Sequence, residues 1–182
     1  GKEAVLDGYS GTLYIEPDEH TLRQLEYKET VEGRKKELLT RLKGRKNITR
    51  DGHEIKIYAN ILNSGELEAA VKNDTGGIGL FRTEFMCFDR PAFPDEEFQF
   101  YTYRKALEVM KGKEVIIGTY DIGADKRPDY MGISAERNPS MGCRGIRFCL
   151  EQENVFKTQL RALYRASAYG QLSILLPMVI DV

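Results

Sequence analysis

The sequence has three cysteines, almost no net charge and no long apolar run, and each scarcity excludes a class of protein. No stretch approaches the roughly 20 consecutive apolar residues that a membrane-spanning helix needs, so we expect no membrane span. Cys87, Cys143 and Cys149 are odd in number and lack Cys-x-x-Cys spacing, which is untypical of a disulfide framework or a zinc site. Because disulfides form in oxidising compartments, this cysteine usage favours a reducing, cytoplasmic setting, and we expect no signal peptide.

The balance of charges excludes another class. The 27 basic and 28 acidic residues give a formal net charge of −1. Proteins that attract nucleic acid or anionic membranes over a distance carry an excess of positive charge, so we expect neither partner. With 41% hydrophobic and 30% charged residues, the 182-residue chain has the composition of a globular protein of one or two domains.

The first 50 residues predict a hairpin followed by one long polar helix. Apolar residues 4–6 and 12–15 flank the glycine-rich turn 7–11, which is a strand–turn–strand pattern. Pro17 and the acidic residues after it are typical of a helix start, and the basic residues around Gly44 are typical of a helix end. The helix has a broken apolar stripe, which is typical of a helix that bridges domains. Since a two-stranded hairpin is marginal alone, we expect a piece of a longer protein.

From residue 51 onward, strand and helix patterns alternate. The predicted strands cover residues 54–61, 78–81, 115–120 and 172–176, with helical patterns between them. Alternation of this kind implies an α/β fold with parallel strands and helices outside. An open doubly wound sheet and a (β/α)8 barrel both fit, and four strands make half a barrel. The apolar residues expected on or near the buried helix faces are Phe98, Tyr101, Leu107, Met110, Phe156, Leu160, Leu163 and Tyr164.

The most informative stretch follows the second predicted strand. Arg82, Thr83 and Glu84 come directly after the buried run 78–81. A charged group at the end of a buried strand must be paired or must face a ligand, because burying it alone is too costly. Ligands of parallel α/β proteins bind at this end of the strands. A structural Arg–Glu pair and a ligand site are both open interpretations of these residues.

Two further stretches have the same pattern. Asp121, Asp125 and Lys126 follow the third predicted strand, and Arg144 follows an Asn-Pro-Ser-Met-Gly-Cys run at residues 138–143. Each stretch is punctuated by glycine and carries charged side chains. Because the carboxyl ends of parallel strands share one edge of the sheet, the three stretches predict one shared site.

These stretches resemble a known family. Residues 79–85, 121–126, 138–144 and 159–167 closely resemble enzyme I of the bacterial sugar phosphotransferase system, the phosphoenolpyruvate–protein phosphotransferase family. The resemblance covers nearly the whole chain in order, and residues before 18 are similar to the end of the family's swivelling phosphohistidine domain. The pyruvate phosphate dikinases and phosphoenolpyruvate synthases fit these motifs less well.

The resemblance implies a cytoplasmic, homodimeric, magnesium-dependent enzyme of sugar transport. It implies transfer of the phosphoryl group of phosphoenolpyruvate to an enzyme histidine, and then to the histidine-containing phosphocarrier protein. In family terms, residues 1–17 end the swivel domain, 18–50 form a linker helix, and 51–182 form the first half of a (β/α)8 phosphoenolpyruvate-binding barrel. The phosphorylated histidine is expected before residue 1. The magnesium ligands and the catalytic cysteine are expected beyond residue 182, so we expect no catalytic or metal-binding residue here and an inactive fragment.

The resemblance also assigns residues to the site. Arg82 and Arg144 match family arginines that bind phosphoenolpyruvate. The planar guanidinium suits this role because it binds phosphate through two parallel hydrogen bonds and stays charged. Asp121, Asp125 and Lys126 match a loop beside the site and are expected to shape it rather than to bind metal.

One position departs from the family pattern. Gly118 stands where the family has an arginine that also binds phosphoenolpyruvate. A charge-assisted hydrogen bond is typically worth about 1.5–3 kcal/mol, and loss of a transition-state donor costs about 10²–10³ in rate. The alternative prediction is therefore a non-catalytic or regulatory paralogue that has lost full phosphoenolpyruvate binding.

Overall fold

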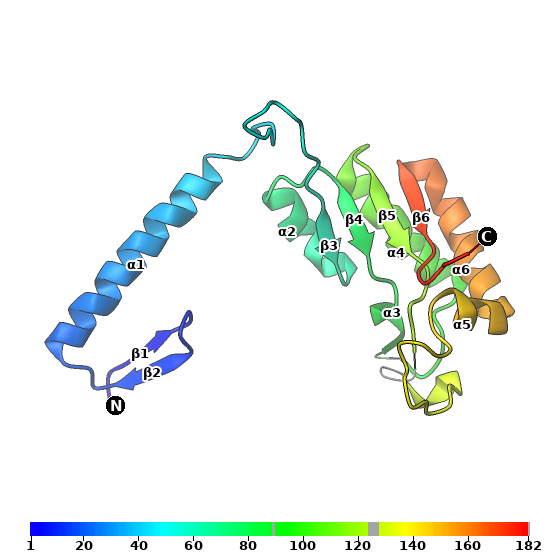
Figure 1. Ribbon diagram of the computed structural model, residues 1–182, viewed down its shortest axis with the longest axis horizontal. Helices are drawn as coiled ribbons and strands as arrows, with labels where there is room; N and C mark the ends of the chain where they lie inside the picture. Colours follow the sequence, from blue (N-terminus) through cyan, green and yellow to red (C-terminus); the bar gives the residue numbers. More distant parts are fainter. Residues whose placement is uncertain (89, 124–127, 182) are drawn as a thin grey trace. The chain divides into compact units, whose positions relative to one another are not determined.

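The computed structural model describes residues 1–88, 90–123 and 128–181 (Figure 1). The chain forms two compact units, Gly1–Arg45 and Lys46–Val182. None of the helices in the described residues combines the length and apolarity needed to cross a membrane.

The first unit is a hairpin and one helix. Strands β1 (Ala4–Asp7) and β2 (Thr12–Ile15) pair antiparallel, as the sequence predicts. Helix α1 (Glu19–Thr40) begins where it is expected, because the Asp18 side chain accepts a hydrogen bond from the Thr21 amide and caps the first turn. It ends a few residues before the predicted basic end, and none of its residues is buried. Its role as a linker between domains stays a prediction.

The second unit contains a parallel sheet of four strands in the order β3-β4-β5-β6. The strands are β3 (Ala59–Ile61), β4 (Ile78–Phe81), β5 (Val115–Gly118) and β6 (Leu172–Leu175). Their order in space follows the sequence, whereas a doubly wound sheet reverses direction part-way. The α/β prediction is therefore confirmed, and closure into a (β/α)8 barrel stays a prediction.

Two long helices lie between these strands, α4 (Glu96–Met110) and α6 (Glu153–Ala166). The shorter segments are η1 (Ser64–Glu66), α2 (Leu67–Lys72), α3 (Phe85–Phe88), η2 (Asp129–Met131), α5 (Ile146–Glu151) and η3 (Ser167–Tyr169). The start of α4 is capped by Asp95, whose carboxylate accepts a hydrogen bond from the Phe98 amide at 2.8 Å. Figure 1 shows α3 and α5 at the carboxyl ends of the strands.

Two hydrophobic clusters hold this unit together. The larger lies between the sheet and α4 and α6, where Phe81 meets Tyr103 edge-on with ring centres 6.4 Å apart. The smaller lies at the carboxyl ends of the strands and contains Tyr120 and Phe148. Cys87 and Cys149 are buried in it and act as packing residues.

The strand predicted over residues 54–61 is wrong in its first half. Only Ala59–Ile61 is a strand, and Glu54 forms an isolated bridge with Ile48. Ile55 and Ile57 alternate with polar residues but are 49% and 57% exposed. An alternating pattern specifies a strand only where a neighbouring strand and a core receive it, and neither is present here.

Two aromatic residues that were expected on or near buried helix faces are exposed to solvent. Tyr101 on α4 is 60% exposed and Tyr164 on α6 is 71% exposed. The buried residues of α4 include Phe100, Tyr103 and Leu107, which share one face at helical spacing. Tyr101 falls off that face, and Tyr164 misses the corresponding face of α6 in the same way.

Candidate functional site

The predicted site lies at the carboxyl ends of β4, β5 and β6. A cavity of about 190 Å³ opens there. Its lining comprises Leu80, Arg82, Glu84, Gly118, Thr119, Asp121, Leu175 and Pro177. Residues that follow β4 and β5 therefore share one cavity, as the pattern of charged residues after the strands predicts.

Arg82 is paired and also faces this cavity. Its backbone amide donates to the Ile61 carbonyl at 2.9 Å, which fixes the start of the loop after β4. Its Nε donates to Oε1 of Glu84 at 2.9 Å. The Glu84 side chain is 9% exposed, so the guanidinium neutralises a carboxylate that is almost fully buried. The two interpretations of the sequence are thus not exclusive, because one arginine holds the ion pair and lines the cavity.

Arg144 makes a two-point ion pair with Asp121. Nε and Nη2 of Arg144 donate to Oδ1 and Oδ2 of Asp121 at 3.0 and 3.1 Å. This parallel geometry is the strongest that an arginine and a carboxylate can form. Asp121 lines the cavity, whereas Arg144 is held behind it and is not among the lining residues. The predicted neighbours Asp125 and Lys126 lie outside the described residues.

The loop that carries Arg144 is anchored on both sides. Oε1 of Glu136 accepts a hydrogen bond from the Cys143 amide at 3.0 Å, and Nε of Arg147 donates to the Gly142 carbonyl at 2.7 Å. The Glu136 carboxylate occupies the space that a side chain at Gly142 would fill. A residue larger than glycine would displace this carboxylate, and Arg147 holds the loop through its bond to the Gly142 carbonyl.

Gly118 determines how open the cavity is. A β-carbon at this position would meet Cδ1 of Leu80 at 3.2 Å, and both residues line the cavity. The flexible end of Leu80 must give way by a few tenths of an ångström to admit a side chain here. An arginine at position 118 would therefore enter the cavity beside Arg82, which is the one cation that lines it among the described residues.

A buried polar network lies behind the cavity, and sequence reasoning missed it. Thr83 and Gln159 are both completely buried. Oγ1 of Thr83 donates to the Gly118 carbonyl at 2.7 Å, and Nε2 of Gln159 donates to Oγ1 of Thr83 at 3.0 Å. The sequence signal for this network was Gln159, a glutamine at a position of α6 where the helical pattern predicts an apolar residue. Burial raises the pKa of Tyr103, whose hydroxyl joins this network, so the phenol stays neutral.

The cysteines are not activated. Burial raises the pKa of Cys87 and Cys149 to about 12. The pKa of Cys143 rises to about 11, first through burial and then through its contact with the Glu151 carboxylate. A thiol is nucleophilic only as the thiolate, so the structure gives none of these three cysteines a nucleophilic role at neutral pH.

The described residues do not fit the magnesium site that the resemblance implies for the family. No cluster of three His, Cys, Asp or Glu side chains able to hold a metal occurs in the described part of the chain. The two carboxylates of the cavity, Glu84 and Asp121, are each paired with an arginine. A hard cation needs several oxygen ligands, and two carboxylates paired in this way do not supply them.

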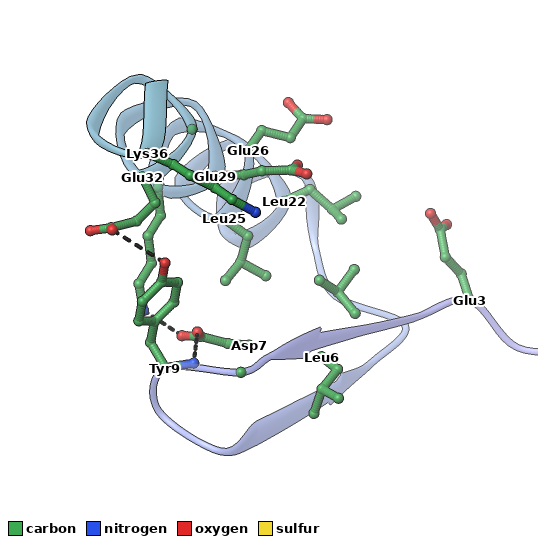
Figure 2. A pocket seen from close by; sticks show the side chains of 14 residues that line it. Glu3, Leu6, Asp7, Tyr9, Leu22, Leu25, Glu26, Glu29, Glu32 and Lys36 are labelled. Carbon is green, nitrogen blue, oxygen red and sulfur yellow. Dashed lines mark hydrogen bonds and ion pairs between the residues drawn. The ribbon is translucent and has the colours of Figure 1, made fainter. Parts of the chain in front are cut away.

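A second cavity, of about 590 Å³, lies within the first unit between the hairpin and α1 (Figure 2). Leu25 points into it from the helix, and Glu29 and Glu32 add acidic groups to its lining. The Asp7 carboxylate accepts hydrogen bonds from Nζ of Lys28 at 2.5 Å and from the Tyr9 amide at 3.0 Å. The Lys28 bond, followed by those from Ser10 and Tyr9, holds the pKa of Asp7 well below its usual range. None of the predicted site residues lines this cavity.

Comparison with known proteins identifies the family of this chain. Residues 36–182 match the model of the PEP-utilising enzyme, PEP-binding domain family. Over 179 residues the chain is 41% identical to the phosphoenolpyruvate-protein phosphotransferase of Staphylococcus carnosus, which covers 98% of this chain and 31% of that protein. Over 182 residues it is 40% identical to the protein of that name from Priestia megaterium and 38% identical to the one from Bacillus subtilis, covering 32% of each.

The chain spans about a third of the length of these curated relatives, and the similarity runs through almost all of it. The resemblance expected from the four motifs is thereby confirmed. The chain belongs to the family of PEP-utilising enzymes, within their PEP-binding domain, and is similar throughout to the phosphoenolpyruvate-protein phosphotransferases.

Proposed function

We propose that this chain is the phosphoenolpyruvate-binding segment of a phosphotransferase. The protein would move the phosphoryl group of phosphoenolpyruvate to an enzyme histidine and on to the histidine-containing phosphocarrier protein, in sugar transport. It would act as a cytoplasmic homodimer, and residues 51–182 would form the first half of its (β/α)8 barrel. The observation that carries the proposal is the pair of arginine–carboxylate ion pairs at one edge of the sheet.

The chemistry of the substrate fits these ion pairs. Phosphoenolpyruvate is a small anion with a phosphate and a carboxylate, and moving its phosphoryl group is mostly positioning and charge stabilisation. Arg82 uses Nε for Glu84, and its terminal nitrogens make no hydrogen bond within the described residues. They are the donors that would bind the phosphate. Arg144 would contribute its charge to the same pocket while Asp121 holds its orientation.

The chain's own part in the reaction is therefore to bind and orient the substrate. Glu84 and Asp121 hold the two guanidiniums in place before the ligand arrives, so little reorganisation accompanies binding. In this proposal magnesium, when bound to residues beyond this chain, neutralises charge on the substrate. The nucleophile and the metal ligands would be supplied by other parts of the protein, so the chain alone would transfer no phosphoryl group.

A second candidate function follows from Gly118. Because none of the described residues places a cation at this part of the cavity wall, the protein would bind phosphoenolpyruvate more weakly than an enzyme with an arginine there. In that case the protein is a non-catalytic or regulatory paralogue. The two candidates share the site and differ in how well it holds the substrate.

Calorimetric titration with phosphoenolpyruvate, with and without magnesium, tests the proposal. Binding is measured on the 182-residue chain. Activity is measured on a chimaera in which this chain replaces the matching segment of the Priestia megaterium relative. We expect Arg82→Gln and Arg144→Gln each to weaken binding by about 10- to 100-fold, the range of one charge-assisted hydrogen bond. Arg23→Gln is the matched control, because its exposed guanidinium pairs with Glu19 one turn away on the same helix and lies outside the cavity. Equal affinity in all four proteins would contradict the proposal.

The variant Gly118→Arg separates the two candidate functions. If Gly118→Arg binds phosphoenolpyruvate much more tightly and transfers the phosphoryl group much faster in the chimaera than the unaltered protein does, the result supports the candidate in which the paralogue has lost function. Tight binding and full transfer by the unaltered chimaera, with no gain from the arginine, would support the working phosphotransferase.

A further inference from the structure

Gln159 lies outside the cavity but contacts both strand ends that border it. It projects from α6 and is completely buried. Oε1 accepts a hydrogen bond from the Tyr120 amide at 3.2 Å, and Nε2 donates to Oγ1 of Thr83 at 3.0 Å. Nε2 also lies 3.3 Å from the hydroxyl oxygen of Tyr103. Every polar atom of this amide thus has a partner.

The orientation of this amide is determined by its partners. A backbone N–H can only donate, so the atom that faces the Tyr120 amide must be the carbonyl oxygen. The Thr83 hydroxyl gives its proton to the Gly118 carbonyl and offers a lone pair to Nε2 of Gln159. The Tyr103 hydroxyl gives its proton to Oε1 of Gln99 and accepts from Gln159 in the same way. With the amide reversed, two donors would face each other inside the core, which costs about 1–3 kcal/mol for each unmet group.

The contacts of Gln159 lie next to both ion pairs. Thr83 stands between Arg82 and Glu84, and Tyr120 directly precedes Asp121. The ladder between β4 and β5 ends at the pair of Phe81 with Ile117, so the residues that carry the ion pairs lie beyond it. Past that point the two strand ends are joined by the bond from Thr83 to the Gly118 carbonyl and by the Gln159 amide.

We propose that Gln159 is a positioning residue that sets the separation between the Arg82–Glu84 ion pair and the Asp121–Arg144 ion pair. It acts through Thr83 and Tyr120 and does not touch the cavity. The inference rests on the proposed function, because the separation matters if one anion bridges the two sites. A donor displaced by a fraction of an ångström loses much of its hydrogen bond to a ligand of fixed size.

The test compares three variants with the unaltered protein. Each comparison is made twice, in the 182-residue chain and in the chimaera. Gln159→Met keeps the volume and removes both contacts to the strand ends. Tyr103→Phe removes the hydroxyl at the far end of the network, so it disturbs the same core while leaving both contacts to the strand ends. Gln159→Glu keeps the acceptor for the Tyr120 amide, but its buried neutral carboxyl has one O–H donor in place of the two N–H donors that reach Thr83 and Tyr103.

Two measurements separate positioning from stability. The Nε–H signals of Arg82 and Arg144 in ¹⁵N NMR spectra report the two ion pairs without any ligand, and calorimetry reports the affinity for phosphoenolpyruvate. We expect Gln159→Met to shift both Nε–H signals and to weaken phosphoenolpyruvate binding by about tenfold. Tyr103→Phe should lower the melting temperature and leave both signals and the affinity unchanged. Gln159→Glu should fall between the two.

The opposite results overturn the inference. Unchanged Nε–H signals and affinity in Gln159→Met would show that the strand ends keep their separation without the amide. If Gln159→Met and Tyr103→Phe both lose affinity, and each loss is in proportion to the fall in that variant's melting temperature, Gln159 has a structural role only. If the unaltered chain does not bind phosphoenolpyruvate at all, the proposed function falls, and the ligand-free signals still decide whether Gln159 positions the arginines.

If Gln159→Met does not fold, Thr83 offers a second comparison. Thr83→Ser keeps the hydroxyl that accepts from Gln159 and donates to Gly118, whereas Thr83→Val keeps the shape and removes the hydroxyl. We expect the valine variant alone to shift the Arg82 signal and to weaken binding. Equal behaviour of the two variants would overturn the inference.

Discussion

The two compact units hold their charged groups in different ways. In Lys46–Val182 the carboxylate of Glu84 and the amide of Gln159 lie against a hydrophobic core, and the core determines where they are. In Gly1–Arg45, all of which the structure describes, Asp7 is the only buried residue. The hairpin of that unit is joined to α1 by the ion pair of Asp7 with Lys28 and by the hydrogen bond from the Tyr9 hydroxyl to Glu32.

The difference shows which forces place a functional group. Burial of apolar area contributes about 25 cal/mol per Å², whereas an exposed ion pair contributes about 0–1 kcal/mol. The larger unit can therefore hold two arginines against the entropy of their side chains, and the smaller unit holds the Lys28–Asp7 ion pair with little apolar burial around it. The predictions below test this comparison.

The largest expected effect is in the core behind the site. Phe81→Ala removes a completely buried ring between the sheet and α4, and we expect the free energy of unfolding to fall by about 3–5 kcal/mol. Leu39→Ala on α1, where the side chain is 58% exposed, should change it by less than about 0.5 kcal/mol. Denaturant unfolding followed by circular dichroism measures both. Similar losses in the two variants would remove the contrast between the units.

A smaller effect is expected at the loop that carries Arg144. Gly145 has a φ of 57°, and a β-carbon there would meet Cγ of Met178 at 2.7 Å and the Pro177 carbonyl at 2.9 Å. Gly145→Ala should lower the free energy of unfolding by about 1–3 kcal/mol and weaken phosphoenolpyruvate binding, because strain and the clash shift the loop. Gly132→Ala is the matched control, with a φ of 64° and open space around it. Gly132→Ala should lower the free energy of unfolding through backbone strain alone and should leave phosphoenolpyruvate binding unchanged.

The pH dependence of the first unit tests how far its one buried carboxylate, that of Asp7, stabilises it. The pKa of Asp7 is lowered by Lys28, Ser10 and Tyr9, so this carboxylate stabilises the fold in its ionised form. Its contribution is complete above the unfolded value of about 4 and is lost as the pH falls through the lowered pKa. NMR signals of Tyr9 and Lys28 should therefore keep their folded positions at pH 5 and change in strong acid. In Asp7→Asn this acid transition should be absent, and its persistence would assign it to another group.

The smallest effect is expected from the cysteines. Since burial raises the pKa of Cys87 and Cys149 to about 12, iodoacetamide should modify neither at pH 7 in the folded chain. Cys143 is partly exposed and its pKa is raised to about 11, so it should react slowly. Mass spectrometry after alkylation measures the three rates. Fast reaction at Cys87 would show that the core of the larger unit opens more readily than its burial indicates.

Local patterns were enough where neighbouring residues decide the structure. The start of α1 after Pro17 and the apolar run of β4 were predicted because their signals lie within a few residues. The shared cavity of Arg82 and Asp121 followed from the rule that parallel strands end at one edge. Ile55 and Ile57 misled the prediction because alternation alone does not show whether a core is present.

The sequence by itself determined the order of elements, the family and the residue types at the strand ends, because these depend on patterns that run along the chain. Only the tertiary structure decided that Glu84 and Asp121 each hold one arginine, and that Gln159 joins the two strand ends from α6. Gln159 and Thr83 are 76 positions apart in the chain. No local pattern records a hydrogen bond over that distance, because packing of α6 against the sheet creates it.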